Sequence, residues 1–192
     1  MKRDIYTNKF NSSFLSFEKD IETILRKLFI ESNPYSEILK RLLVINTKDC
    51  LDNLESPAIK EKLGQMSLAK LRQEGYIKLE PKIAMPEHEE VKSYIIVSCD
   101  NFSPNNDNPY YRDCTVNFTI VCHLDCWDLG NYRIRPLKIA GFIDGILNEA
   151  KLSGIGTFNF VGCDEVVYNE DLAGYTLIYR AVHGNEDKIP RE

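Results

Sequence analysis

Residues 110–127 read YYRDCTVNFTIVCHLDCW, and this stretch decides the fold class of the chain. The side chains of a strand point alternately to its two faces, so even-numbered and odd-numbered residues separate here. The even-numbered face is apolar and comprises Cys114, Val116, Phe118, Ile120, Cys122, Leu124 and Cys126. The odd-numbered face is more polar and comprises Thr115, Asn117, Thr119, Val121, His123 and Asp125. The pattern predicts one long strand with a buried face, and it places His123 on the solvated face.

Further strands flank this one. Alternating or densely apolar runs predict strands at 76–83, 93–99, 157–168 and 175–182. The segment 100–109, which precedes the long strand, is rich in Asn, Asp and Pro, the residues that favour turns. It is too long for a tight hairpin. We therefore expect a protruding loop between two paired antiparallel strands.

The first part of the chain is predicted to be helical. Apolar residues at helical spacing predict helices at 17–30, 35–45, 58–63, 67–74 and 137–150. Asn33-Pro34 ends the first helix, because proline disfavours helical geometry in the residue before it. Pro136 suits the first turn of the last helix.

This order of elements predicts an α+β fold. An antiparallel sheet of about four strands is covered on one face by the helix near 137–150, and an N-terminal helical region precedes it. Residues 1–75 form that helical region and residues 76–192 form the α+β sheet domain. We expect the two to make one compact unit, because 192 residues suit a single domain.

The charge of the chain excludes some functions. Its 24 basic and 29 acidic side chains give a net charge of -5, which argues against a protein that reads nucleic acid through a basic face. Residues 1–75 hold 13 basic and 11 acidic side chains, and residues 76–192 hold 11 and 18. The acidic excess therefore lies in the sheet domain. Neither a secretory leader nor a membrane span is expected, since no apolar run is long enough.

The six cysteines are the main candidates for chemistry. Three of them fall on the apolar face of the long strand, where a free cysteine behaves as a small hydrophobic residue. Cys122 and Cys126 would lie roughly 13 Å apart along an extended strand, too far to share one zinc ion. We interpret these thiols as core residues. The alternative is a cytosolic metal- or thiol-dependent enzyme built on Cys114, Cys122, His123, Cys126 and Cys163.

Other catalytic patterns are weak. The acidic pairs Asp164-Glu165 and Glu170-Asp171 suit solvated positions, and the chain has no glycine-rich phosphate-binding motif. Adjacent residues of a strand point to opposite faces, so His123 cannot serve Cys122 as a base. We therefore predict a protein that is not an enzyme and has no catalytic residue, cofactor or metal.

The sheet half resembles the neck and tail-completion proteins of tailed bacteriophages, and the tail-terminator type in particular. The likeness runs over about residues 91–187 and rests on five segments: RDCTVNFTIVCH at 112–123, CWDLG at 126–130, RIRPLKIAGFID at 133–144, LSGIGTF at 152–158 and NEDLAGY at 169–175, which leads into His183-Gly184. The terminators share the order strand, strand, helix, strand, strand.

The resemblance implies a structural virion protein at the head–tail junction, assembled in the host cytoplasm. Copies of the chain would form a hexameric ring that contacts the tail tube protein and the head connector or stopper proteins. DNA would pass through the ring without specific binding, which an acidic wall favours because it repels phosphates. The resemblance implies no membrane partner. A head-closure or connector protein of the same neck is the alternative within this class.

Five residues are the candidate contacts with neighbouring subunits. Asn105, Asn106 and Asp107 belong to the predicted loop, and Arg133 and Arg135 lie at the entry to the last helix. The arginines could instead be ordinary solvated charges.

Overall fold

The helices of the protein lie where the spacing of apolar residues predicts them, within a few residues at each end. The computed structural model describes residues 17–30, 34–52, 55–80, 90–106 and 111–184. Its helices are α1 (Phe17–Phe29), α2 (Pro34–Val44), α3 (Pro57–Gly64), α4 (Leu68–Gln73) and α5 (Arg135–Leu147). The side chains that α1 buries follow the predicted face, for example Ile24 and Leu28.

One mixed sheet forms the other layer. Its strands are β1 (Ile77–Lys78), β2 (Ser93–Pro104), β3 (Tyr111–His123), β6 (Asn159–Val167) and β7 (Leu172–Gly184). They lie in the order β1-β2-β3-β7-β6, and every neighbouring pair is antiparallel except β1 and β2. The short strands β4 (Lys151–Leu152) and β5 (Gly156–Thr157) pair separately. The predicted α+β class is confirmed.

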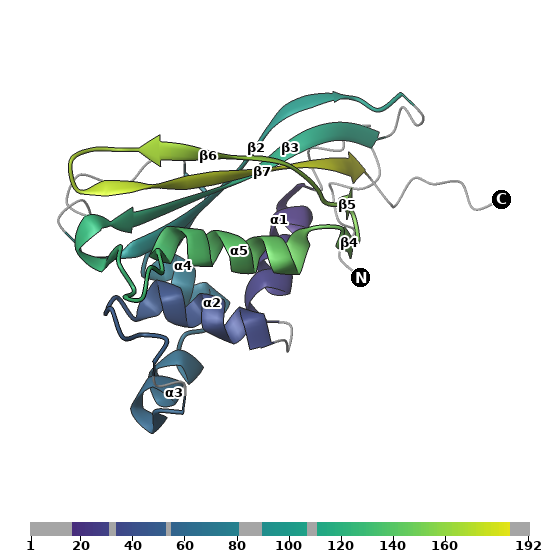
Figure 1. Ribbon diagram of the computed structural model, residues 1–192. Helices are drawn as coiled ribbons and strands as arrows, with labels where there is room; N and C mark the ends of the chain where they lie inside the picture. Colours follow the sequence, from purple (N-terminus) through teal and green to yellow (C-terminus); the bar gives the residue numbers. More distant parts are fainter. Residues whose placement is uncertain (1–16, 31–33, 53–54, 81–89, 107–110, 185–192) are drawn as a thin grey trace.

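The helices lie on one side of the sheet (Figure 1). The alternation predicted for the central strand is confirmed from Cys114 to Cys122, whose side chains on the helix-facing surface are at most 2% exposed. They pack with side chains of α1, α2 and α5 in one continuous apolar cluster. The opposite face of the sheet buries a much smaller group of side chains: Tyr94, Ile96, Val121 and Leu172.

The central strand is shorter than predicted. β3 ends at His123, and a 3-10 helix covers Leu124–Cys126. The imidazole Nδ1 of His123 accepts a hydrogen bond from the backbone N–H of Asp125 at 3.1 Å, which caps this turn. The prediction that His123 is solvated is wrong, since its side chain is only 8% exposed. Cys126 is buried as expected, although the turn rather than the strand places it there.

The last strand begins earlier than predicted. β7 starts at Leu172, three residues before the predicted start of the strand at 175. Gly174 makes this possible, because a Cβ there would lie 1.7 Å from the carbonyl oxygen of Ile120 on the neighbouring strand. Only glycine allows the two backbones to approach so closely.

Burial of the thiols predicts that the protein loses stability at alkaline pH. Burial raises the pKa of Cys122 and of Cys99 from 9.0 to about 12, so the folded state keeps both protons where the unfolded chain releases them. The stabilisation is complete below about pH 8.5 and falls as the pH rises further, by up to about 1.4 kcal/mol per pH unit for each thiol.

We expect urea denaturation at pH 8, 9.5 and 10.5 to show this decrease. Cys122→Ala is the matched variant, because it removes one thiol with a strongly raised pKa from the folded core. Its free energy of unfolding should fall less steeply with pH than that of the natural protein. Equal slopes for the two proteins would contradict the assignment.

Candidate assembly interface

The hairpin of β2 and β3 extends beyond the helices as an arm (Figure 1). The pairing of β2 with β3 shifts register between Asp100 and Ser103, where Asn101 adopts a left-handed backbone with φ 53°. The ring of Phe102 packs edge-on against Phe17 of α1, with 5.5 Å between the ring centroids. Helix α1 therefore supports the base of the arm.

Hydrogen bonds between side chains connect the two strands of the arm. The carboxylate of Asp100 accepts from Asn101 Nδ2 at 2.8 Å and from Asn117 Nδ2 at 2.9 Å. Further out, Asn105 Nδ2 donates to Asp113 Oδ1 at 2.8 Å. The bonds of Asp100 with Asn117 and of Asn105 with Asp113 join the β2 side of the arm to β3, whereas the bond between Asp100 and Asn101 lies within β2.

The predicted contact residues of the loop differ in their surroundings. Asn105 is half-buried and bonded to Asp113, so it helps to shape the arm. Asn106 is exposed and lies two residues beyond the end of β2, which continues to Pro104 within the predicted loop. Asp107 lies outside the described residues.

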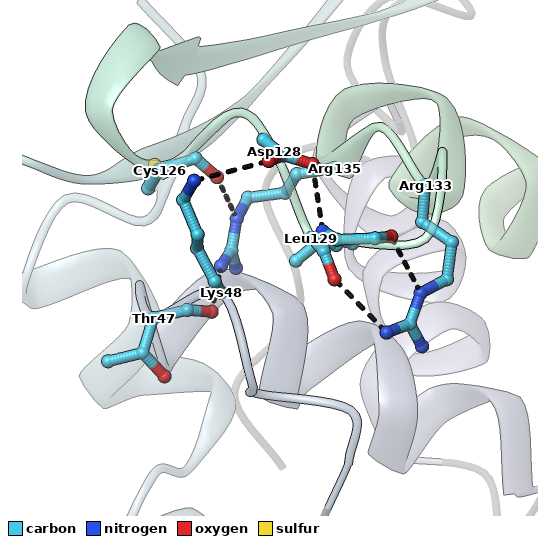
Figure 2. Close-up of polar contacts among 8 residues, drawn as sticks. Thr47, Lys48, Cys126, Asp128, Leu129, Arg133 and Arg135 are labelled. Atoms are coloured by element: carbon cyan, nitrogen blue, oxygen red, sulfur yellow. Dashed lines mark hydrogen bonds and ion pairs between the residues drawn. The ribbon is translucent and has the colours of Figure 1, made fainter.

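Arg135 occupies a different environment from the one predicted. Its side chain is 0% exposed, and Figure 2 shows its guanidinium between Cys126 and Thr47. It donates to four backbone carbonyls: Cys126 at 2.6 Å, Leu42 at 2.6 Å, Ile45 at 2.9 Å and Thr47 at 2.7 Å. No carboxylate of the described residues pairs with it.

These contacts correct the prediction that Arg135 meets a neighbouring subunit. The carbonyls at the C-terminal end of a helix lack partners within the helix and carry partial negative charge, which suits a cation. Arg135 therefore caps α2 and the loop after it, and at the same time binds the turn that follows β3. A second buried arginine, Arg41, donates to the carbonyl of Cys50 at the end of the same loop.

Arg133 lies nearer the surface but is also bound within the chain. Its guanidinium donates to the carbonyls of Leu129 at 3.0 Å and Gly130 at 3.2 Å (Figure 2). The same group forms an ion pair with Asp52 at 3.0 Å, and its side chain is 26% exposed. Arg133 thus fastens the loop before α5 to the N-terminal region.

The loop held by Arg133 presents a residue that the sequence analysis missed. Tyr132 is 105% exposed and adopts a left-handed backbone with φ 61°. This conformation costs a residue with a side chain roughly 1–2 kcal/mol. The turn residues that precede it, Gly130 and Asn131, could have indicated a displayed side chain. A fully exposed aromatic ring on an ordered loop is a candidate contact, because aromatic residues contribute strongly to protein interfaces.

The base of this loop carries two polar contacts that fix its shape. Asp128 accepts from the backbone N–H of Gly130 at 2.8 Å and pairs with Lys48 Nζ at 3.2 Å (Figure 2). Both interactions lower the pKa of the Asp128 carboxyl, the bond from Gly130 more than the lysine. The loop therefore stays ordered while Tyr132 points into solvent.

The cysteines are dispersed rather than gathered at one site. Cys114, Cys122 and Cys126 are buried, and Cys163 is exposed on β6. Desolvation raises the pKa values of Cys122, Cys126 and Cys163, so all three are protonated at neutral pH. In the part of the chain that the structure describes, no three His, Cys, Asp or Glu residues are grouped so that they could hold a metal ion.

The structure is thus an α+β chain with a one-sided sheet, a projecting arm and a displayed tyrosine. The chain belongs to the YomW family, whose model matches residues 36–181, and this family is derived from phages. No curated protein matches the chain. Among the described residues, no helix has the length and apolar character needed to cross a membrane.

The contacts of Arg135 and Arg133 predict very different losses of stability when each arginine is replaced by methionine. Arg135→Met would leave four carbonyls without their donor, three of them beside the end of α2. We expect it to lower the free energy of unfolding by about 3–5 kcal/mol. Arg133→Met removes a partly exposed ion pair and two hydrogen bonds to carbonyls near the surface, and should cost less, about 1–2 kcal/mol. Chemical denaturation of the two variants tests this, and similar losses in both would contradict the role of Arg135.

Proposed function

We propose that this protein is a structural virion protein of a tailed phage and acts as a tail terminator. Copies of the chain form a hexameric ring at the head–tail junction, between the tail tube protein and the head connector or stopper proteins. DNA passes through the ring without specific binding. The protein catalyses no reaction.

The observation that carries the proposal is the projecting arm of β2 and β3 in a chain of a phage-derived family. An arm held rigid by its own hydrogen bonds can reach a neighbouring subunit or ring without losing much conformational freedom. The order of strands around α5 supports the same assignment, since tail terminators share it.

The distribution of charge suits a ring around DNA. Residues 76–192 hold 11 basic and 18 acidic side chains, so the sheet domain repels phosphate groups. A wall of this charge lets DNA slide past, whereas a basic wall would hold it through released counterions.

Loss of the gene from the phage tests the proposal directly. We expect DNA-filled heads and separate tail tubes longer than normal, because a terminator stops the growth of the tube. Electron microscopy of the lysate measures both. Tails of normal length beside heads that lose their DNA would identify the alternative, a head-closure protein. Normal infectious particles would contradict both roles.

The arm can be tested separately from the gene. Deleting residues 103–108 shortens the arm beyond the register shift, so we expect the same thermal unfolding temperature within a few degrees. Heads and tails should nevertheless fail to join in an in vitro assembly assay. Joining at the normal rate would exclude the arm from the mechanism.

Tyr132 gives a second, finer test of contact with other proteins. Tyr132→Ala changes a fully exposed side chain, so its effect on stability should stay within about 0.5 kcal/mol. We expect incorporation into particles to fall at least tenfold, as for an aromatic residue at the centre of an interface. Leu137→Ala, which shortens another exposed apolar side chain, is the control.

The metal- or thiol-dependent enzyme remains a second hypothesis, and the zinc content of the purified protein tests it. Stoichiometric metal would favour that enzyme. Folded protein without metal would favour the structural role.

A further inference from the structure

Strand β6 leaves one edge of the sheet open. It pairs with β7 and, within the described residues, with no strand on its other side. Its burial pattern is exposed at seven of nine positions, including Phe160, Val161 and Val167. An exposed apolar edge strand offers unpaired backbone groups to another chain, and proteins rarely leave one uncovered.

The opposite edge of the sheet, formed by β1 and β2, is also open along part of its length. β1 pairs only with Ile95 and Ile96, so the backbone of β2 from Val97 onward has no strand beside it in the described part of the chain. A groove of about 920 Å³ lies along this stretch, between α1 and α4. Its lining is largely apolar and includes Ile21, Leu25, Leu68, Leu79, Val97 and Cys99.

We propose that β6 of one copy of this chain docks in the groove beside β2 of the next copy. The occupant is a second copy because the two open edges belong to the same sheet and complement each other, an apolar strand at one and an apolar groove at the other. The inference adds the contact between neighbouring copies to the proposed function, and it rests on that function for the existence of the ring.

The direction of the strands allows the same contact to form between each copy and the next. β2, β3, β7 and β6 alternate in direction, so β6 of one copy runs antiparallel to β2 of the next when both copies stand the same way up. Each copy then uses one edge to bind and offers the other, which is a heterologous contact. Such contacts close into a ring when the rotation between copies allows it.

The faces of the strands restrict the register, because only shifts by an even number of residues keep the same side chains on the helix-facing surface. Cys163 pairs with Leu177 and Cys99 pairs with Val116, and both partners belong to the buried, helix-facing surface. Cys163 and Cys99 therefore lie on the same face of the sheet and can stand opposite each other. In that antiparallel register Glu165 stands opposite Val97.

The order of residues along the groove gives the contacts at its two ends. Phe17 packs against Phe102, so one end lies towards the arm. Helix α4 leads directly into β1, which pairs with Ile95 and Ile96, so Arg72 lies at the other end. The register brings Phe160 towards the aromatic end of the groove.

The charges at the second end are complementary. Arg72 is exposed on the rim of the groove and forms no ion pair within the described residues. Glu165 is exposed on the helix-facing side of β6 and would lie beside it. The other rim charges include Glu22 and Arg26, which pair with each other at 2.8 Å. Asp164, the neighbour of Glu165, points to the opposite face of the sheet.

A charge exchange tests this contact. Arg72→Glu and Glu165→Arg should each raise the dissociation constant for self-association at least tenfold, measured by analytical ultracentrifugation of the full chain. The double variant restores opposite charges and should return to within threefold of the natural protein. Asp164→Arg is the matched control, since it makes the same change of charge on the other face and should alter association less than threefold.

Three results would overturn the proposal. They are a chain that stays monomeric at the highest concentration reached, single variants that associate normally, and a double variant no stronger than the singles. Single variants that associate normally, together with intact rings in phage particles, would reject this contact and leave the proposed function standing. Loss of the gene without effect on particles would reject the proposed function, whereas the charge exchange would still report on the contact.

The two cysteines provide an independent check of the register. Mild oxidation of the assembled protein at pH 8.5, with copper phenanthroline and dissolved oxygen, should link Cys163 of one copy to Cys99 of the next. A ladder of linked chains on a non-reducing gel is expected, and either Cys163→Ser or Cys99→Ser should abolish it. A ladder that persists in either variant would overturn this register.

Discussion

The buried guanidinium of Arg135 is the constraint on which the rest of the structure depends. A cation at 0% exposure must have its donors satisfied, and here backbone carbonyls from two distant parts of the chain do so. Leu42 and Thr47 belong to the helical region, and Cys126 belongs to the turn after β3. The guanidinium therefore fixes α2 against the start of α5, and α5 in turn covers the sheet.

The helices cover only one face of the sheet, and this arrangement determines which surfaces remain for other proteins to contact. The helix-facing surface takes up almost all of the apolar core, and α5 contributes Ile139, Ile143 and Leu147 to it. The two edges of the sheet and the arm stay accessible, together with the loop that displays Tyr132. These are the surfaces that the proposed assembly would use, and the family to which the chain belongs is derived from phages.

Much of the fold could be predicted because periodicity reports local burial. The helices, the alternation from Cys114 to Cys122 and the α+β class all follow from spacing. The end of β3 could not be predicted, because one hydrogen bond between His123 and Asp125 turns the chain within an otherwise regular pattern. The candidate site was predicted less well. Both arginines were expected at a contact surface, but Arg135 is buried and bound to its own chain, whereas Arg133 is partly exposed and its contact role stays a prediction.

The sequence by itself determined which faces of the elements are apolar and that the sheet domain is acidic. Each of these depends on residues close together along the chain. Only the tertiary structure decided that Arg135 is a buried cap, since its donors reach carbonyls 93 and 88 positions away. The same holds for the open edges of the sheet, because the order β1-β2-β3-β7-β6 arises from long-range pairing that no local pattern records.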